Sequence, residues 1–233
     1  MPPRHLKSIC ISVGFCAWAL GKDPSKKIIV ASYGDRLSRE HTSSFRTLIE
    51  NSIYLALFEH MRIDPRANNA SEIRTTNRGG RLAVARGGAV TGFGADILIV
   101  DDLHKADEAR SAVERDNTFH FFTDTLLSRL NDKDTGSTIV VQQRLHEDDL
   151  AGRLIAQGGY THLNLPAIAE DAQVFDLGFG RTYQRNIGDV LFEDREPRHV
   201  LDNMRREMGA QAFNAQYQQN PCLLYTSPSP RDS

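Results

Sequence analysis

Short runs of β-branched and other apolar residues alternate along this chain with longer stretches in which apolar residues recur at helical spacing. The short runs predict strands that are buried on both faces, at residues 28–33, 97–100, 137–141 and 161–165. The longer stretches predict helices at residues 8–20, 37–51, 112–130 and 196–219. Strands and helices that alternate in this way indicate an α/β domain with a mainly parallel sheet and helices on both faces.

Turn-forming residues set further boundaries. Two short strands around Asn-Arg-Gly-Gly at 77–80 predict a hairpin over residues 71–86. Gly21 is expected to stop the first helix, and Pro197 is expected at the first position of the last one. Residues 167–186 look like a loop, and residues 222–233 look disordered. The apolar stripe of the 112–130 helix is expected to face the core: Phe119, Phe121, Phe122, Leu126 and Leu127.

The strand at 97–100 runs directly into two carboxylates, Asp101 and Asp102. An apolar strand that ends in paired acids is the Walker B pattern of P-loop ATPases, in which one acid holds Mg²⁺ and its neighbour orients the attacking water. The alternative is a buried strand that runs into an acidic surface turn. Open α/β sheets bind ligands at the carboxyl ends of their strands, which favours the functional interpretation.

A second phosphate-binding pattern stands at the start of the chain. Residues 2–8 read Pro-Pro-Arg-His-Leu-Lys-Ser and lead into the first predicted helix. Lys7 and Ser8 match the last two positions of a Walker A loop, but Met1 and Leu6 occupy its two glycine positions. Backbone N–H groups at a helix N-terminus would cradle phosphates, the lysine would reach them, and the serine would bind Mg²⁺. A secretory signal peptide is the alternative for residues 1–20.

Other polar segments are open to two interpretations. The basic residues of the 37–51 helix and its start, which include Arg36, Arg39, His41 and Arg46, suggest either a solvated face or contact with a phosphate backbone. Gln143 follows the strand at 137–141, where a polar side chain could sense the γ-phosphate. The cluster at 146–149 suggests helix-start acids rather than a metal site.

Composition narrows the class of protein. The 233 residues carry a formal net charge of −2, which argues against a bulk nucleic-acid coat but allows a local basic patch. Three cysteines without metal-type spacing indicate a reducing compartment and no disulfide framework. No apolar stretch is long enough to cross a membrane.

Taken together, these residues resemble the large terminase subunit of tailed bacteriophages, in the branch whose Walker A loop reads Pro-Pro-Arg-His-x-Lys-Ser. The matching segments are residues 1–8, 28–33, 87–102, 126–130, 143–150, 163–168 and 212–219. The resemblance implies a P-loop ATPase of the ASCE type that uses ATP and Mg²⁺ to drive viral double-stranded DNA into the procapsid during virion assembly. It also implies a portal protein and a small terminase subunit as partners, a homo-oligomeric ring, no membrane, and the cytoplasm of the infected bacterial host.

The resemblance assigns roles to individual residues. The phosphate loop would comprise Arg4, His5, Leu6, Lys7 and Ser8. Ser8 and Asp101 would hold Mg²⁺, while Lys7, Arg4, Asp102 and Gln143 would be catalytic, the last by coupling hydrolysis to movement.

Two departures from the family pattern are visible. Asp102 stands where many ATPases have Glu, and Phe93 stands where related sequences often have an arginine. If that arginine acts on the neighbouring subunit, Arg86 or Arg129 would have to replace it.

The expected organisation is an ATPase core at 1–165, a helical or linker part at 166–221 and an artefactual tail at 222–233. The strand before the phosphate loop and the family's nuclease domain are expected to be missing, so the chain resembles a fragment. Two other functions are compatible with the motifs: another DNA-dependent P-loop ATPase such as a helicase-like translocase, or a non-catalytic nucleotide-binding or scaffold protein.

Overall fold

The computed structural model describes residues 1–90 and 92–221, so the predicted tail at 222–233 lies outside the described residues. The chain forms two compact units. The sheet unit comprises residues 6–142, and the hairpin unit comprises residues 1–5 together with residues 143–221. The expected boundary at residue 165 therefore does not coincide with the division between compact units. Whether it separates an ATPase core from a linker stays a prediction.

The sheet unit contains a six-stranded sheet in the order β2-β3-β4-β1-β5-β6. Strands β1, β4, β5 and β6 are parallel, and β2 and β3 add an antiparallel edge. The strands are β1 (Lys27–Ser32), β2 (Ile63–Asn68), β3 (Glu72–Thr75), β4 (Gly80–Ala85), β5 (Ile97–Asp101) and β6 (Ser137–Val141). The predicted strands at 28–33, 97–100 and 137–141 and the predicted hairpin (β3–β4) are thus confirmed.

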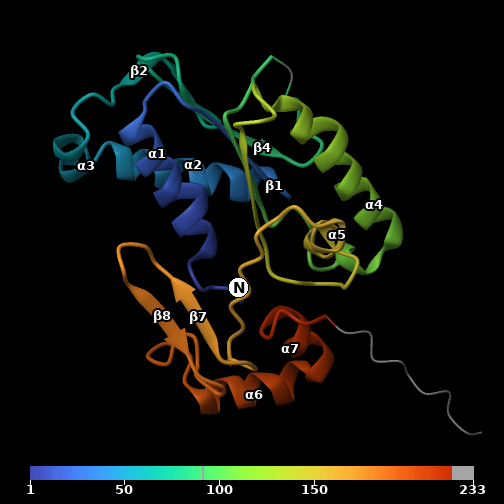
Figure 1. The fold of residues 1–233 in the computed structure, drawn as a ribbon. Helices are drawn as coiled ribbons and strands as arrows, with labels where there is room; N and C mark the ends of the chain where they lie inside the picture. The colour runs from blue at the N-terminus through green and yellow to red at the C-terminus, as the bar shows by residue number, and fades with distance from the viewer. Residues whose placement is uncertain (91, 222–233) are drawn as a thin grey trace, which may run out of the picture. The chain divides into compact units, whose positions relative to one another are not determined.

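Helices cover both faces of this sheet, as Figure 1 shows for α1 and α2 on one side and α4 on the other. The helical elements are the π-helix η1 (Ile9–Phe15), α1 (Cys16–Lys22), α2 (Asp35–Ile49), α3 (Ser52–Leu57), the 3-10 turn η2 (Glu108–Arg110), α4 (Ala112–His120), the π-helix η3 (Phe121–Leu126) and the 3-10 turn η4 (Leu127–Arg129). The fold is a mainly parallel α/β sheet flanked by helices, as in P-loop NTPases, which confirms the predicted fold class.

The core of the sheet unit lies between β1 and the helices η1, α1 and α2. Its largest fully buried apolar members include Leu20, Ile28, Phe45 and Ile49. Across α4, η3 and η4, Phe122 and Leu126 are buried as predicted, whereas Phe119, Phe121 and Leu127 are only partly buried.

Gly21 does not end the first helix, which continues to Lys22. A Cβ at Gly21 would lie 2.5 Å from Cγ of Phe58, so the glycine is required by the close approach of that ring. The prediction failed because a glycine can mark either a helix end or a close contact, and the local sequence does not distinguish them.

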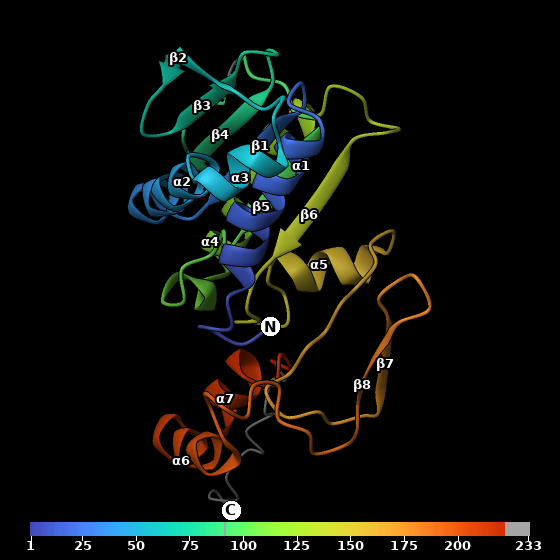
Figure 2. The same ribbon diagram turned by 90° about the vertical axis from the view of Figure 1, so that its left-hand side faces the viewer.

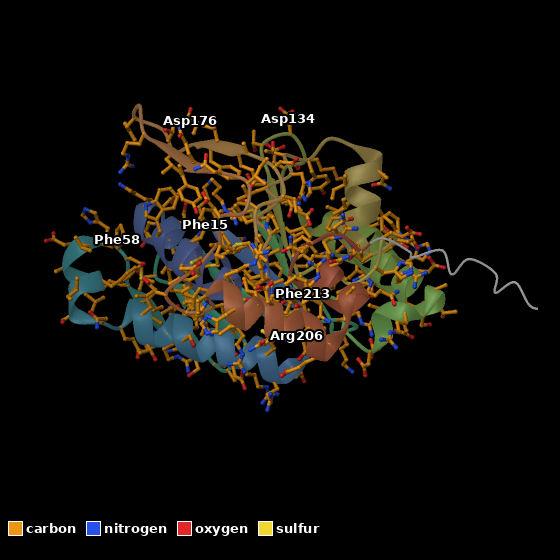
Figure 3. All side chains as sticks on the ribbon, turned by 90° about the horizontal axis from the view of Figure 1, so that it is seen from below. Phe15, Phe58, Asp134, Asp176, Arg206 and Phe213 are labelled. Carbon is orange, nitrogen blue, oxygen red and sulfur yellow. The ribbon has the colours of Figure 1, made fainter. Side chains whose placement is uncertain are left out.

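The hairpin unit contains α5 (Leu150–Gln157), the antiparallel hairpin β7 (Gln173–Asp176) and β8 (Thr182–Arg185), α6 (Arg198–Met208) and α7 (Ala210–Gln216). Figure 2 shows this hairpin and the two last helices from a second side. Phe213, labelled in Figure 3, stacks on Tyr217 with ring centroids 5.2 Å apart and packs in a small core with Ala167 and Leu201.

Four predictions for this unit were wrong. Residues 161–165 form no strand, and Leu163 is 58% exposed, so this stretch has too few apolar residues to form a buried strand. The stretch at 167–186 is not all loop, because it contains the β7–β8 hairpin. The last helix breaks at Gly209, whose φ of 81° lies in the left-handed region, and Pro197 is its N-cap rather than its first residue.

Among the described residues, no helix is both long and apolar enough to cross a membrane.

Candidate active site

The two acids of the Walker B pattern lie at the carboxyl end of β5. Asp101 is the last residue of the strand, where it faces Ser32 of β1 and Val141 of β6, and its side chain is fully buried. Asp102 follows with φ 45°, and its N–H donates to the carbonyl of Val141 at 2.9 Å. The left-handed turn at Asp102 moves the second carboxylate out of the strand, and it is 20% exposed. Aspartate tolerates this conformation better than most residues.

Lys7 and Ser8, at the start of η1, contact these two acids. Ser8 Oγ donates to Asp101 Oδ1 at 2.9 Å, and Lys7 Nζ forms an ion pair with Asp102 Oδ2. Lys7 is buried, and Ser8 uses its hydroxyl for Asp101 rather than to cap its own helix. Four predicted site residues from two distant segments therefore converge at one end of the sheet.

Two positions of this loop have left-handed backbone, and one of them is a glycine position of the Walker A pattern. Leu6 stands at the second glycine position of the Walker A pattern, with φ 61°, and Arg4 has φ 62°. This is the left-handed region, which costs a residue other than glycine roughly 1–2 kcal/mol. The loop thus adopts the backbone that the standard motif gives to glycine, and the leucine carries strain there.

Replacing Leu6 by glycine is therefore expected to stabilise the protein. The Leu6 side chain is 52% exposed, so little apolar burial is lost. Glycine relieves the backbone strain, but its greater freedom in the unfolded chain offsets part of this benefit. The free energy of unfolding is expected to rise by about 0.5–1 kcal/mol, which corresponds to a Tm rise of about 2 °C. Thermal unfolding measures this, with Leu6→Ala as control because alanine keeps the strain. An equal rise in both variants would contradict the explanation.

A buried polar cluster lies behind Asp101. Ser12 Oγ donates to Asp101 Oδ2 at 2.6 Å, and His41 Nδ1 lies 3.7 Å from the same oxygen. Burial raises the pKa of Asp101, and the neighbouring Asp102 carboxylate raises it further. Burial also lowers the pKa of His41, although the Asp101 carboxylate opposes that shift.

Ser12 was not predicted as a site residue, and His41 was wrongly grouped with the exposed basic residues of its helix. Ser12 lies four residues after Ser8 in one helix, and this spacing places both on the same face. His41 belongs to the buried stripe of α2 together with Ser38, Thr42, Phe45 and Ile49, whereas Arg36 and Arg39 are exposed. A one-face stripe at helical spacing was the signal that would have separated His41 from its basic neighbours.

Three other predicted site residues belong to the hairpin unit. They are Arg4 and His5 of the phosphate loop and Gln143, the predicted coupling residue. His5 is buried there, with Nδ1 2.9 Å from the carbonyl of Pro3 and Nε2 3.7 Å from Glu196 Oε2. The roles predicted for Arg4, His5 and Gln143 stay predictions.

The two arginines considered as replacements for Phe93 are differently placed. Arg86 is held within the sheet unit by two ion pairs and a hydrogen bond. It pairs with Glu108 and, at 3.1 Å, with Glu114, and it donates to Thr118 Oγ1 at 2.8 Å. Among the described residues, the Arg129 guanidinium donates only to the neighbouring Ser128 hydroxyl, at 3.0 and 3.2 Å. Arg86 therefore has a role within its own unit, and Arg129 is the better candidate of the two.

Neither a family model nor a curated protein matches this sequence. Among solved structures, the crystal structure of the HK97 bacteriophage large terminase is similar, with a TM-score of 0.59 at 13% sequence identity. The match covers 94% of this chain and 45% of that one, so the chain spans less than half the length of the solved terminase. The resemblance to phage large terminases that the motifs predict is therefore confirmed as a similarity of fold.

Proposed function

We propose that this chain is an ATP hydrolase whose site is built from Lys7, Ser8, Asp101 and Asp102. The observation that carries the proposal is the hydrogen bond of 2.9 Å between Ser8 Oγ and Asp101 Oδ1, across 93 residues of sequence. It joins a helix start, where phosphates bind, to the acids at the end of a parallel strand. A merely structural acidic turn would not require a lysine and a serine from a loop with strained backbone.

The reaction is an in-line attack of water on the γ-phosphate. Lys7 Nζ stabilises the negative charge of the phosphates, and Asp102 orients the water. These two groups form an ion pair with each other, which places both at the same point of the site. The phosphates of ATP would attract Lys7 Nζ, and the Asp102 carboxylate would accept a hydrogen bond from the attacking water.

The donors at this site fit Mg²⁺. The ion prefers oxygen ligands and is usually held by one or two protein groups together with substrate phosphates and water. Ser8 Oγ and Asp101 Oδ1 supply two such oxygens side by side. Among the described residues, no group of three or more His, Cys, Asp and Glu forms a dedicated metal cage. Ser8 and Asp101 would hold Mg²⁺, which supplies positive charge on the phosphate oxygens.

The biological role that best accounts for the fold is the motor of viral DNA packaging. The fold similarity to a phage large terminase supports it. We infer that the whole protein acts in the cytoplasm of an infected bacterium, as a ring that moves double-stranded DNA through a portal into the procapsid with a small terminase subunit. In this proposal Arg4, His5 and Leu6 complete the phosphate loop and Gln143 couples hydrolysis to movement.

Nucleotide binding by the full 233-residue chain tests the proposal. We expect weak binding of a fluorescent ATP analogue that Mg²⁺ strengthens, together with slow hydrolysis, because a trans-acting arginine worth about 10³–10⁵ in rate requires an assembled ring. A chain that binds nucleotide but never turns it over, even with DNA added, would favour the non-catalytic alternative. Absence of nucleotide binding in a folded chain would exclude the site.

A further inference from the structure

The two oxygens of the Asp101 carboxylate have different surroundings. Oδ1 accepts a hydrogen bond from Ser8, a residue of the phosphate loop. Oδ2 accepts one from Ser12, which is fully buried, and lies 3.7 Å from His41 Nδ1. One oxygen is thus directed to the substrate side of the site, and the other is directed into the protein.

The groups on the inner oxygen are themselves fixed by a buried arginine. Arg81 of β4 is fully buried, and its Nε donates to the carbonyl of Ser12 at 3.2 Å. Its Nη1 donates to Thr42 Oγ1 at 2.9 Å, next to His41 in the chain, and its guanidinium lies 5.3 Å from the ring centroid of Phe45. One side chain therefore connects η1, which carries Ser12, to α2, which carries His41.

This arrangement restricts rotation of the Asp101 carboxylate. A carboxylate that is bonded on one oxygen only can turn about its Cβ–Cγ bond, and a ligand that needs a defined oxygen then has to stop that rotation. A short hydrogen bond on Oδ2 removes the freedom in advance. Groups that orient a metal ligand in this way typically change metal affinity 10–100-fold when they are removed.

We propose that Ser12 and His41 are positioning residues that hold Asp101 Oδ2, so that Oδ1 stays turned toward Ser8 and toward a Mg²⁺ bound with ATP. The inference rests on the proposed function and extends it to two residues outside both motifs. Arg81 acts one step further away, because it fixes the helices that carry these two residues. In this arrangement the buried polar cluster orients a ligand of the metal site, in addition to packing in the core.

Titration of the Mg²⁺ dependence of nucleotide binding tests the inference. The probe is a fluorescent non-hydrolysable ATP analogue bound to the full chain, with Mg²⁺ varied and with an EDTA series as the metal-free reference. Ser12→Ala is expected to raise the Mg²⁺ midpoint about 10–100-fold, while affinity in EDTA stays within about twofold of wild type. His41→Leu is expected to raise the midpoint by a smaller factor, about three- to tenfold.

Two further variants make the result specific. Ser12→Cys keeps nearly the same volume but replaces a strong donor by a weak one, so it serves if Ser12→Ala does not fold. Ser38→Ala removes another buried serine, on α2, that makes no hydrogen bond to Asp101 among the described residues, and it should leave the midpoint unchanged. Thermal unfolding of each variant shows that the proteins compared are folded.

Each outcome has a definite meaning. A midpoint within twofold of wild type in both folded Ser12 variants would overturn the positioning role. So would an equal loss of affinity in Mg²⁺ and in EDTA, which indicates a general effect on the loop. If the wild-type chain binds the analogue no better with Mg²⁺ than without it, the proposed metal site itself fails, and that result is distinct from the other two.

Discussion

Lys7→Ala is expected to lower the rate of ATP hydrolysis by about 10²–10³-fold, the effect of removing one preorganised group that stabilises transition-state charge. Lys7 Nζ is held at the end of β5 by its ion pair with Asp102, within the buried part of the site. A nearby water cannot replace it, because water carries no charge. Steady-state phosphate release by the wild-type and variant chains measures the effect.

The variant should remain folded. The ion pair is partly accessible on the Asp102 side, so its loss is expected to cost no more than about 1 kcal/mol of stability. Lys22→Ala is the matched control, because Lys22 is an exposed lysine at the end of α1 and should not affect turnover. Wild-type turnover by a folded Lys7→Ala chain would remove the assignment of the phosphate loop.

Replacing each acid by its amide is expected to have a different effect on hydrolysis and on Mg²⁺-dependent binding. Asp102→Asn should stop hydrolysis but keep Mg·ATP bound, because it removes the charge that orients water and leaves Asp101 in place. It also frees Lys7 from its ion pair, so binding of ATP without Mg²⁺ should become tighter, by up to about fivefold. Asp101→Asn should instead weaken the Mg²⁺-dependent part of binding, because an amide is a poorer ligand for Mg²⁺ than a carboxylate.

Equilibrium binding in Mg²⁺ and in EDTA, combined with phosphate release, distinguishes these effects. Asp96→Asn provides a control acid in the same unit, since Asp96 lies at the opposite end of β5 and accepts the N–H of Lys27 at 2.8 Å. If both amide variants lose binding equally, or if neither loses turnover, the roles assigned to Asp101 and Asp102 are wrong.

The parallel part of the sheet could be predicted because its strands are nearly continuous apolar runs. Residues 28–33, 97–100 and 137–141 all lie within a residue or two of β1, β5 and β6. The edge strand β2 and the short helix α3 could not, because β2 is half exposed and contains Pro65, and α3 is only six residues long. The β7–β8 hairpin was missed for a similar reason: most of its residues are exposed, so no buried face leaves a pattern in the sequence.

At the site, the residues of the two motifs could be identified from spacing and residue type. The residues that hold Asp101 in place could not. Ser8 and Asp101 are bonded as expected of the pattern. Ser12, His41 and Arg81 belong to no motif, and their roles depend on which face of η1, α2 or β4 points to Asp101. Arg81 in particular is a charged residue that composition rules place at the surface, and only the tertiary arrangement shows it fully buried.

The left-handed backbone at Leu6 and Asp102 also bears on how such proteins are found in genomes. A search that requires glycine at the second conserved position of the phosphate loop rejects this chain, since leucine stands there with φ 61°. A search that requires the dihedral angle, a serine bonded to a strand-end aspartate and the adjacent second acid accepts it. Sequences that carry another residue in place of this glycine are therefore better recognised by backbone angles than by residue names.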